Sequence, residues 1–421
     1  MKSHYQVIVV GGGSSGLMAA VQAAQQGASV LILEKNPKLG RKLLLSGGGR
    51  CNVTNRTSRQ ELIHHIPGNG KFLYSALNQF DQEDIVAFFQ DRGVALKEED
   101  HGRMFPVTDS ARTILDTLLK EAIDLGVEIQ TKAIVEKIEF DQNSKKVKGL
   151  QLASGEKIGA QGIILAVGGK AYPRTGATGD GYAWAKAAGH TISRLYPTEA
   201  PLLSNDPWIS DGSMKGVSLR DVAVSLWDQN DKCITRHQMD MIFTHFGYSG
   251  PAILRASGHV NLWLHETKAK TASLTIDLQP NLDQKTLAMQ AEASRDKQII
   301  TLLKAYMPEK MGQTLLSLLQ IDPSTPYKQL VHAQQDQLWQ SLKAFPITAY
   351  GSQPIEKGFV TGGGVSTKEV DPATMESKLM GGLYFCGELL DINGYTGGYN
   401  ITAAFVTGAV AGRNCAWATF T

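Results

Sequence analysis

The segment from Tyr5 to Glu34 constrains the fold of this chain more than any other. Tyr5–Val10 is a short β-branched run typical of a buried parallel strand, and it leads directly into the glycine-rich turn 11–16. The residues up to 26 are good helix formers, Gly27 stands where a helix C-cap is expected, and 28–33 form a second apolar run. These elements predict a βαβ unit of the Rossmann type.

The glycine spacing in this unit has a chemical explanation. Gly11 permits the tight turn from strand to helix, Gly13 lets the backbone approach a pyrophosphate, and Gly16 allows close packing of helix on strand. The phosphates would meet the positive end of the helix dipole, and Glu34 would accept hydrogen bonds from both ribose hydroxyls of an adenosine. We therefore predict a dinucleotide-binding site at these residues and Ser15.

A second glycine cluster follows a basic segment at 35–42. The stretch 46–55 reads Ser-Gly-Gly-Gly-Arg-Cys-Asn-Val-Thr-Asn. Its backbone N–H groups, cation and side-chain amides suit a loop that wraps a large planar ligand and its phosphates, whereas the alternative is an ordinary glycine-rich surface loop. The cofactor-binding residues predicted here are Lys35, Arg41, Lys42, Ser46, Gly47, Gly48, Arg50, Cys51 and Asn52.

The motif at 46–55 resembles the signature of the bacterial flavoproteins related to aminoacetone oxidase and to the BaiN-like, bile-acid-reductase-like proteins. The resemblance also covers Phe243–Leu254, where Tyr248 replaces an expected aliphatic residue and 249–251 predict a turn that starts a helix. It implies FAD as the cofactor, with the 46–55 loop close to the flavin.

Further cofactor contacts are implied by resemblance to FAD-binding proteins of the glutathione-reductase type. In those proteins a residue placed like Val135 lends its backbone to the adenine, and small residues at a strand end, as at Gly168, close over the dinucleotide. The stretch 175–182 is similar to the TGDG region of fumarate reductase and succinate dehydrogenase flavoproteins. We expect Asp180 to cap the helix that follows it.

The last part of the chain contains a strand that ends in glycine and acids, followed by a small-residue helix predicted over 401–411. In FAD enzymes of this class the acid after such a strand binds the ribityl chain, and the next helix points its N-terminus at the flavin pyrimidine ring. Free N–H groups there would stabilise the negative charge of the reduced flavin. The residues implied are Gly387, Glu388, Asp391, Gly398, Tyr399, Asn400 and Ile401.

The middle of the chain has a different pattern. Strand-like runs at Val222–Trp227 and Ala272–Leu278 are followed by helical stretches over 282–319. The predicted fold class is α/β, with a Rossmann-type, glutathione-reductase-like FAD-binding domain and an inserted strand-rich domain that carries a helical portion. The predicted boundaries are 1–193 for the first part of the FAD-binding domain, 194–350 for the inserted substrate domain and 351–421 for the second part.

Composition and charge exclude several classes of partner. The net charge of +2 indicates no nucleic-acid partner, and no apolar run reaches the roughly 20 residues that span a bilayer, so no membrane partner is expected. The four cysteines form neither a CxxC pair nor a metal-type cluster. We therefore predict a cytoplasmic protein with free thiols, no metal and a small-molecule substrate. No feature indicates an oligomeric state.

The expected reaction follows from the family resemblance. Aminoacetone oxidase implies hydride removal from a carbon bearing a small primary amine, hydrolysis to an oxo product and ammonia, and reoxidation by oxygen to hydrogen peroxide. The alternative, implied by the BaiN-like proteins, is an NAD(P)H-dependent reduction of an activated C=C bond. No second strand-GxGxxG-helix unit for NAD(P)H is visible. We therefore take the oxidase as the main expectation.

Two further alternatives remain open at the level of sequence. A flavin-dependent RNA-modifying enzyme would share the first domain, but the chain lacks a basic stretch interleaved with aromatic residues. A non-enzymatic flavin-binding protein is the other. No catalytic side chain is assigned, because a flavin takes the hydride itself and needs few acid–base groups from the protein.

Overall fold

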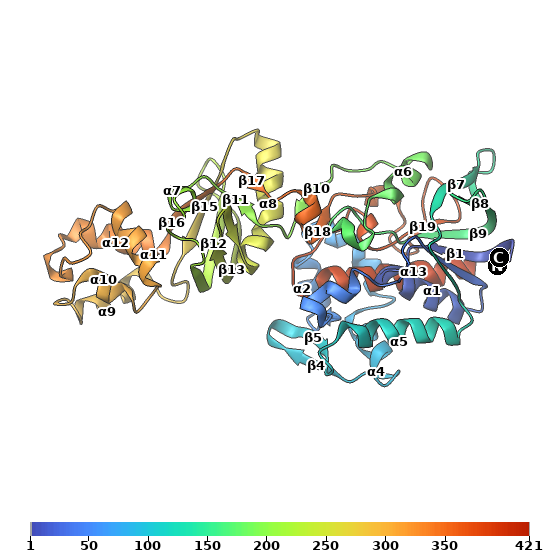
Figure 1. Ribbon diagram of the computed structural model, residues 1–421, viewed down its shortest axis with the longest axis horizontal. Coiled ribbons are helices and arrows are strands. Elements are labelled where there is room, and N and C mark those ends of the chain that lie inside the picture. Colours follow the sequence, from blue (N-terminus) through green and yellow to red (C-terminus); the bar gives the residue numbers. More distant parts are fainter. Residues whose placement is uncertain (1, 421) are drawn as a thin grey trace. The chain divides into compact units, whose positions relative to one another are not determined.

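The computed structural model describes residues 2–420, which form two compact units (Figure 1). Unit 1 combines the chain up to Tyr196 with the chain from Val360 onward, and unit 2 is Pro197–Phe359. The first division lies three residues after the predicted boundary at 193/194, and the second lies nine residues after the one at 350/351. The roles predicted for the parts, cofactor binding and substrate binding, remain predictions.

A seven-stranded sheet forms the centre of unit 1. One part of it is parallel, and β7 and β8 continue it as an antiparallel extension on β9. In sheet order the strands are β6 (Glu128–Thr131), β2 (Val30–Glu34), β1 (His4–Val10), β9 (Lys157–Leu165), β8 (Lys146–Leu152) and β7 (Val135–Asp141), while β19 (Leu383–Phe385) also pairs with β9. The α/β fold of the Rossmann type is confirmed.

Helices cover this sheet. A second, three-stranded antiparallel sheet is formed by the part of the chain between β2 and β6. The helices of unit 1 are α1 (Ser14–Gln25), α2 (Arg59–His64), α3 (Tyr74–Leu77), α4 (Gln82–Gln90), α5 (Ala111–Asp124), α6 (Asp180–Ala187) and α13 (Tyr399–Ala418). The small sheet contains β3 (Thr54–Asn55), β5 (Arg103–Pro106) and β4 (Leu96–Glu99), and the short strands β10 (Tyr196–Thr198) and β18 (Val360–Gly362) pair with each other.

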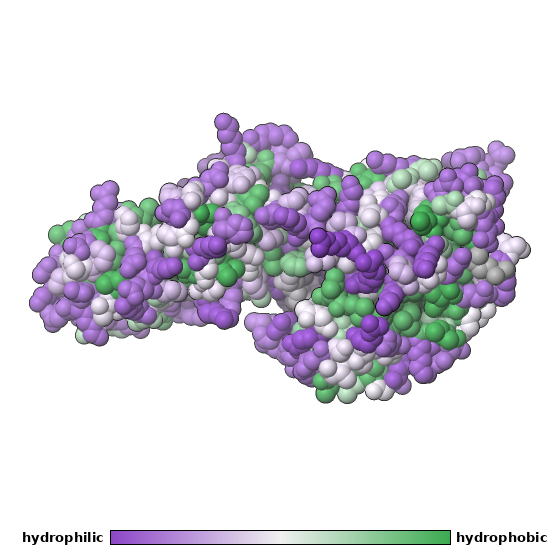
Figure 2. Space-filling model, viewed as in Figure 1, coloured by the Kyte–Doolittle hydropathy of each residue, from purple (hydrophilic) through white to green (hydrophobic). Residues whose placement is uncertain are grey.

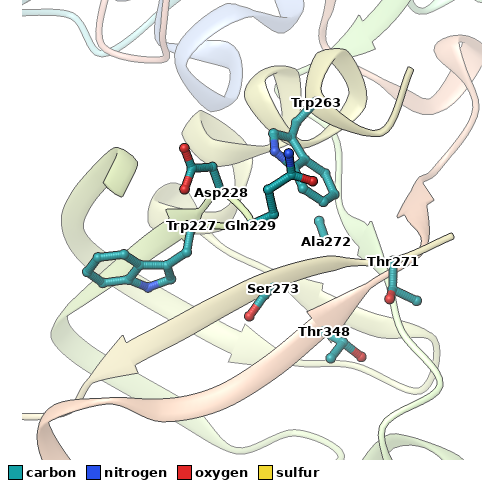
Figure 3. A pocket seen from close by; sticks show the side chains of 8 residues that line it. All are labelled: Trp227, Asp228, Gln229, Trp263, Thr271, Ala272, Ser273 and Thr348. Atoms are coloured by element: carbon teal, nitrogen blue, oxygen red, sulfur yellow. The ribbon is translucent and has the colours of Figure 1, made fainter. Parts of the chain in front are cut away.

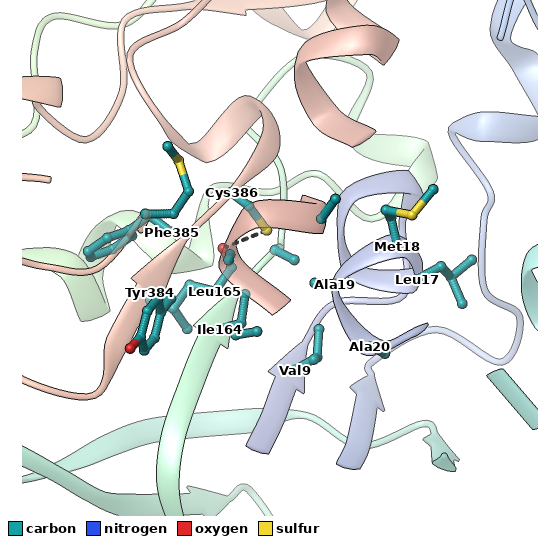
Figure 4. Close-up of a cluster of buried hydrophobic side chains, with 14 of the residues drawn as sticks. Val9, Leu17, Met18, Ala19, Ala20, Ile164, Leu165, Tyr384, Phe385 and Cys386 are labelled. Carbon is teal, nitrogen blue, oxygen red and sulfur yellow. Dashed lines mark hydrogen bonds between the residues drawn. The ribbon is translucent and has the colours of Figure 1, made fainter. Parts of the chain in front are cut away.

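The core of unit 1 explains why the first βαβ unit is so apolar. Val9 of β1, Leu17 of α1 and Phe385 of β19 are fully buried in one cluster of side chains (Figure 4). Helices α1 and α13 approach each other closely, because a Cβ on Gly408 would overlap the Ser15 carbonyl and one on Gly412 the Ala19 carbonyl. The small residues of α13 thus bring the last helix of the chain onto the first.

Unit 2 is strand-rich and carries a helical portion. Its antiparallel sheet contains, in order, β16 (Phe345–Ala349), β15 (Ala272–Asp277), β12 (Ser218–Trp227), β13 (Cys233–Phe243), β14 (Gly247–Ser249), β11 (Leu202–Leu203) and β17 (Gly351–Ser352). Its helices are α7 (Pro207–Ser210), α8 (Pro251–Thr267), α9 (Gln284–Glu292), α10 (Ile299–Leu303), α11 (Glu309–Leu318) and α12 (His332–Lys343). Gly250 is the N-cap of α8, and Pro251 is the first residue of the helix. This confirms the predicted turn that starts a helix.

The last helix is longer than predicted. The sequence predicts a helix over 401–411, but α13 begins at Tyr399 and ends at Ala418. Its N-cap Gly398 has a φ of 99°, a left-handed conformation that glycine adopts without strain. The residues 412–418 contain no proline, and the helix continues through them. Among residues 2–420, no helix has the length and apolar character needed to cross a membrane.

Candidate functional site

The turn between β1 and α1 has the geometry that its glycines predict. Gly11 has a φ of 106°, and a Cβ on Gly16 would overlap the Gly11 carbonyl oxygen, so the helix starts in direct contact with the strand end. Gly13 is different, because its φ is −81° and a Cβ there would meet nothing within 4 Å. The folded chain alone does not require glycine at this position, whereas a ligand that packs on the backbone would.

The N-terminus of α1 is suited to an anion. Its N-cap Gly13 makes no side-chain cap hydrogen bond, and the first turn contains no acidic residue. The positive end of the helix dipole and the first backbone N–H groups are therefore not compensated by the helix itself. Ser15 is buried in this turn, with its hydroxyl against Gly387 at the end of β19.

Glu34 is buried at the end of β2, and its carboxylate already accepts three hydrogen bonds. One oxygen accepts from the Gly12 backbone N–H at 2.9 Å, and the other accepts from the backbone and side-chain N–H groups of Asn36 at 2.8 and 2.6 Å. A carboxylate has about four accepting positions. Glu34 can therefore take one further hydroxyl without losing a partner, and the predicted bidentate ribose contact would displace Asn36.

The three cations of segment 35–42 that were predicted to bind the cofactor have separate partners. Arg41 donates to the Asn36 side-chain oxygen at 2.7 Å, and Lys42 pairs with Glu388. Lys35 pairs with Asp180 and donates to the Thr178 hydroxyl. The expectation that Asp180 caps α6 is wrong: the N-cap is Gly179, without a side-chain cap bond. The carboxylate of Asp180 is directed at the lysine after β2 instead.

The loop 46–55 contacts the start of the last helix. Asn55 donates to the Gly397 carbonyl at 3.0 Å, and the hydroxyls of Thr54 and Thr402 are 2.8 Å apart. A Cβ on Gly398 would crowd the Thr54 carbonyl group and the side-chain amide of Asn52. These contacts join residues more than 340 positions apart in sequence. The loop predicted to surround a flavin therefore lies against the helix predicted to face its pyrimidine ring.

Within this loop, Ser46 and the glycines shape the backbone. The Ser46 hydroxyl donates to the Leu43 carbonyl at 2.6 Å, and Gly47, Gly48 and Gly49 all have positive φ values of 56°, 68° and 89°. Three consecutive left-handed residues are accessible only to glycine at no steric cost. The loop conformation is thus set by the glycines that the sequence motif contains.

Arg50 and Cys51 follow the glycines of this loop. The Arg50 guanidinium pairs with Glu99 and Asp109 and lies 4.1 Å from the Phe105 ring centre. Two carboxylates therefore neutralise this cation, and its contact with a cofactor stays a prediction. Burial raises the pKa of the Cys51 thiol to about 12, which keeps it protonated and favours packing over redox chemistry.

Glu388 connects three parts of unit 1. Besides its pairing with Lys42, it accepts a hydrogen bond from the Thr361 backbone N–H at 2.8 Å. The Thr361 hydroxyl accepts in turn from the backbone N–H groups of Lys170 and Ala171 at 2.8 and 2.9 Å. The segments after β2, β9 and β19 are thereby held together at the carboxyl end of the parallel strands, where ligands bind in open α/β sheets.

The buried Tyr182 lies within electrostatic reach of the half-buried carboxylates of Glu388 and Asp391. Burial raises the pKa of Asp391, opposed by hydrogen bonds from Ser193 and Asn69. Burial also raises the pKa of Tyr182, and the carboxylates of Glu388 and Asp391 add to the effect. The Tyr182 hydroxyl has no hydrogen-bond partner among residues 2–420.

The N-terminus of α13 resembles that of α1 in being open to an anion. Gly398 makes no side-chain cap bond, and the first turn has no acidic residue. Asn400 does not offer its side chain, because its amide binds the Gly394 backbone through both its oxygen and its nitrogen. The predicted contacts of Tyr399, Asn400 and Ile401 therefore rest on their backbone N–H groups.

The remaining predicted positions lie near the same sheet edge. Val135 is the first residue of β7, and the backbone of nearby Ala133 donates to the Glu34 carbonyl at 3.0 Å. Gly168 follows β9 with a φ of 71°. Sequence reasoning did not single out Asn36 and Thr361. Asn36 lies two residues after Glu34, and Thr361 lies in a strand before a glycine run, and these positions are signals that could have identified them.

The residues present fit a bound flavin dinucleotide. Two helix N-termini are uncapped, Gly13 faces open space, and buried polar atoms remain without a partner within the described chain. Among these atoms are the side-chain oxygen of Asn52 and the hydroxyl of Tyr182. Buried polar groups are almost always hydrogen-bonded, so a ligand with hydroxyl and imide groups would satisfy them. No cluster of metal-binding side chains occurs in residues 2–420.

A separate cavity of about 130 Å³ lies within unit 2 (Figure 3). It is lined by Trp227 and Asp228 at the end of β12, Trp263 of α8, and Ser273 and Thr348 of neighbouring strands. The Asp228 carboxylate accepts from the backbone of its own hairpin, and the Trp227 indole donates to Thr275 at 2.8 Å. The polar groups of this cavity thus serve the local fold, and none belongs to the site described above.

Comparison with known proteins identifies relatives over almost the whole chain. The 3-dehydro-bile acid delta(4,6)-reductase of Clostridium scindens is 31% identical over 97% of this chain and 98% of its own length. The ribosomal RNA dihydrouridine synthases of Haemophilus influenzae and Escherichia coli are each 30% identical, over 96% and 95% of this chain and 97% and 95% of their own lengths.

The family and the fold are shown by two further comparisons. Mycobacterium smegmatis Sdh1 in complex with UQ1 has a TM-score of 0.52 at 15% identity, over 99% of this chain and 69% of that one, and shows the fold alone. The model of the HI0933-like protein Rossmann domain matches residues 5–414. The chain therefore belongs to the HI0933-like family of flavoprotein oxidoreductases.

Proposed function

We propose that unit 1 binds FAD along the carboxyl end of its parallel strands. The pyrophosphate would lie at the N-terminus of α1, and one ribose hydroxyl would take the remaining accepting position of Glu34. The isoalloxazine would lie between loop 46–55 and the N-terminus of α13. The contacts of Asn55 with Gly397 and of Thr54 with Thr402 support this placement.

The reaction we propose is the reduction of a C=C bond conjugated to a carbonyl group. The names of the full-length relatives describe related bond chemistry: one is a delta(4,6)-reductase of a 3-dehydro bile acid, and dihydrouridine is uridine with its ring C=C bond saturated. Both support the alternative considered from the sequence over the amine oxidase. The single observation that carries the choice of reaction is the full-length similarity to these named activities. The uncapped, acid-free N-terminus of α13 against loop 46–55 supports the flavin site itself.

The protein groups at this site suit such a reaction. A bound reduced flavin supplies a hydride to the carbon β to the carbonyl. The first N–H groups of α13 would stabilise negative charge on the pyrimidine part of a bound flavin, and the glycine-rich loop would allow close approach to the ring without bulky side chains. The pairing of Lys42 with Glu388 joins the segment after β2 to the segment after β19.

An RNA substrate belongs among the candidates. The sequence predicted no nucleic-acid partner because the net charge is only +2. On the face drawn in Figure 2, hydrophilic and hydrophobic residues are interspersed. Two of the full-length relatives are named for an activity on ribosomal RNA, so RNA stays among the candidate substrates despite the low net charge of this chain.

The direction of electron flow is tested by bleaching the bound flavin without oxygen. The holoprotein is mixed separately with NADH, NADPH and aminoacetone, and the absorbance of the oxidised flavin is followed. A nicotinamide should bleach the flavin and aminoacetone should not. Bleaching by the amine alone would contradict the proposal and restore the oxidase.

A further inference from the structure

His65 lies at the flavin end of the proposed site. It is the C-cap residue of α2, and its ring stacks on Tyr399, the first residue of α13, with centroids 4.6 Å apart and an interplanar angle of 11°. The Tyr395 ring meets it edge-on at 6.3 Å, and the Tyr395 backbone N–H donates to the His65 carbonyl at 3.0 Å. The imidazole is thus fixed to the helix start that we place beside the flavin.

The hydrogen bonding of His65 determines which nitrogen can exchange a proton. Its Nδ1 lies 2.8 Å from the Glu61 carbonyl oxygen. Because a carbonyl oxygen only accepts, Nδ1 carries a hydrogen, and Nε2 is the atom that gains or loses one. The side chain is 25% exposed, so the ring is held in place without being sealed from solvent. This is the arrangement that a general acid needs.

We propose that His65 is the proton donor of the reduction, an inference that rests on the proposed function. The C=C π bond breaks as a hydride adds to the β carbon, and the Nε2–H of the protonated ring gives its proton to the α carbon. The electron pair of the π bond forms that new C–H bond, and the imidazole regains a proton from water. The hydride derives from a dihydronicotinamide, which is oxidised in the preceding half-reaction.

Charged and titratable groups face the His65 ring from more than one element. The Glu61 carboxylate lies 3.8 Å from Nδ1, one turn away on the same helix, and would attract an imidazolium. The rings of Tyr395, Tyr399 and His64 also lie against the imidazole. Proton donation should therefore fail as pH rises and the ring loses its charge.

The test separates flavin reduction from proton transfer. His65→Gln is compared with the matched control His64→Gln. His64 is the neighbouring residue, and its side chain is exposed. Both variants should bind FAD as the unaltered protein does, and nicotinamide should reduce both at the normal rate. Reoxidation by a 4-en-3-one steroid should slow by about 10²- to 10⁴-fold in His65→Gln only, and its dependence on pH should disappear.

Two further measurements test the role of His65 without relying on turnover or on a variant that fails to fold. The imidazole nitrogen chemical shifts of the FAD-free protein should show that His65 carries its hydrogen on Nδ1. The His65 signals are identified because they are missing from the spectrum of His65→Gln. Added imidazole should restore reoxidation in His65→Gly. A normal reoxidation rate in His65→Gln, or a loss in Tyr395→Phe instead, would overturn the role of His65. If the unaltered protein is not reoxidised by the steroid or by uridine in RNA, the proposed function itself fails.

Discussion

The Glu34 carboxylate accepts three hydrogen bonds from the protein itself, so removing it affects both the fold and the proposed ribose contact. Glu34→Ala removes the acceptor for Gly12 and Asn36 together with the proposed ribose contact. Hydrogen bonds to charged groups contribute about 1.5–3 kcal/mol, so FAD affinity should fall roughly 10- to 100-fold. Fluorescence titration of the FAD-free protein with FAD measures this change.

The control for Glu34 is a carboxylate elsewhere in the same unit. Glu139 lies on β7, where it pairs with Lys157 on the surface. Glu139→Ala should leave FAD affinity unchanged. If Glu34→Ala also binds FAD normally, the adenosine end of the site has been placed at the wrong residue.

Single residues also show where sequence reasoning reaches its limit. The roles of Gly11 and Gly16 in the turn could be predicted because strand, glycines and helix are contiguous. The pairing of Lys42 with Glu388 could not, since it joins positions 346 apart. The same limit explains Arg50 and Asp180, whose neighbours Glu99 and Lys35 come from other segments.

At the scale of elements, the packing of α13 on α1 couples the two ends of the cofactor site. Gly408→Ala should lower the free energy of unfolding by about 1–3 kcal/mol, because the new Cβ overlaps the Ser15 carbonyl and overpacks the contact. Helix propensity alone would change stability in the opposite direction, by up to about 1 kcal/mol. The sign of the change, measured by urea unfolding, therefore decides between the two effects.

A control in the same helix separates stability from cofactor binding. Ala418 is exposed at the end of α13, and Ala418→Gly should cost only helix propensity and leave FAD affinity unchanged. Gly408→Ala should in addition weaken FAD binding, because it displaces the turn at Ser15. A stabilised Gly408→Ala variant would contradict the packing described for these helices.

Elements were predicted well where their pattern is local. The βαβ unit, the turn before α8 and the strand-rich character of the middle region follow from periodicity and turn residues, and each is present. The end of α13 was predicted too early: the helix predicted over 401–411 continues to Ala418, and its small residues Gly408 and Gly412 pack against α1. Contacts between elements, which build the site, depend on tertiary packing that no local pattern encodes.

At the scale of the whole molecule, nearly the full length of the chain matches its family and its relatives. Family membership rests on a match to residues 5–414 and on relatives of the same length, and the fold places all three glycine-rich segments in unit 1. The cavity of unit 2 is lined in part by Trp227 and Asp228, whose side chains make hydrogen bonds within that unit.

The central claim, that reduced flavin on this chain saturates a conjugated C=C bond, is tested most directly by a single anaerobic turnover. The holoprotein is reduced, freed of reductant and mixed with a 4-en-3-one steroid or, separately, with RNA that contains uridine. The account predicts that one of the two restores the absorbance of oxidised flavin and yields one saturated product per flavin. Return of that absorbance only when oxygen is admitted, with neither substrate reduced, would contradict it.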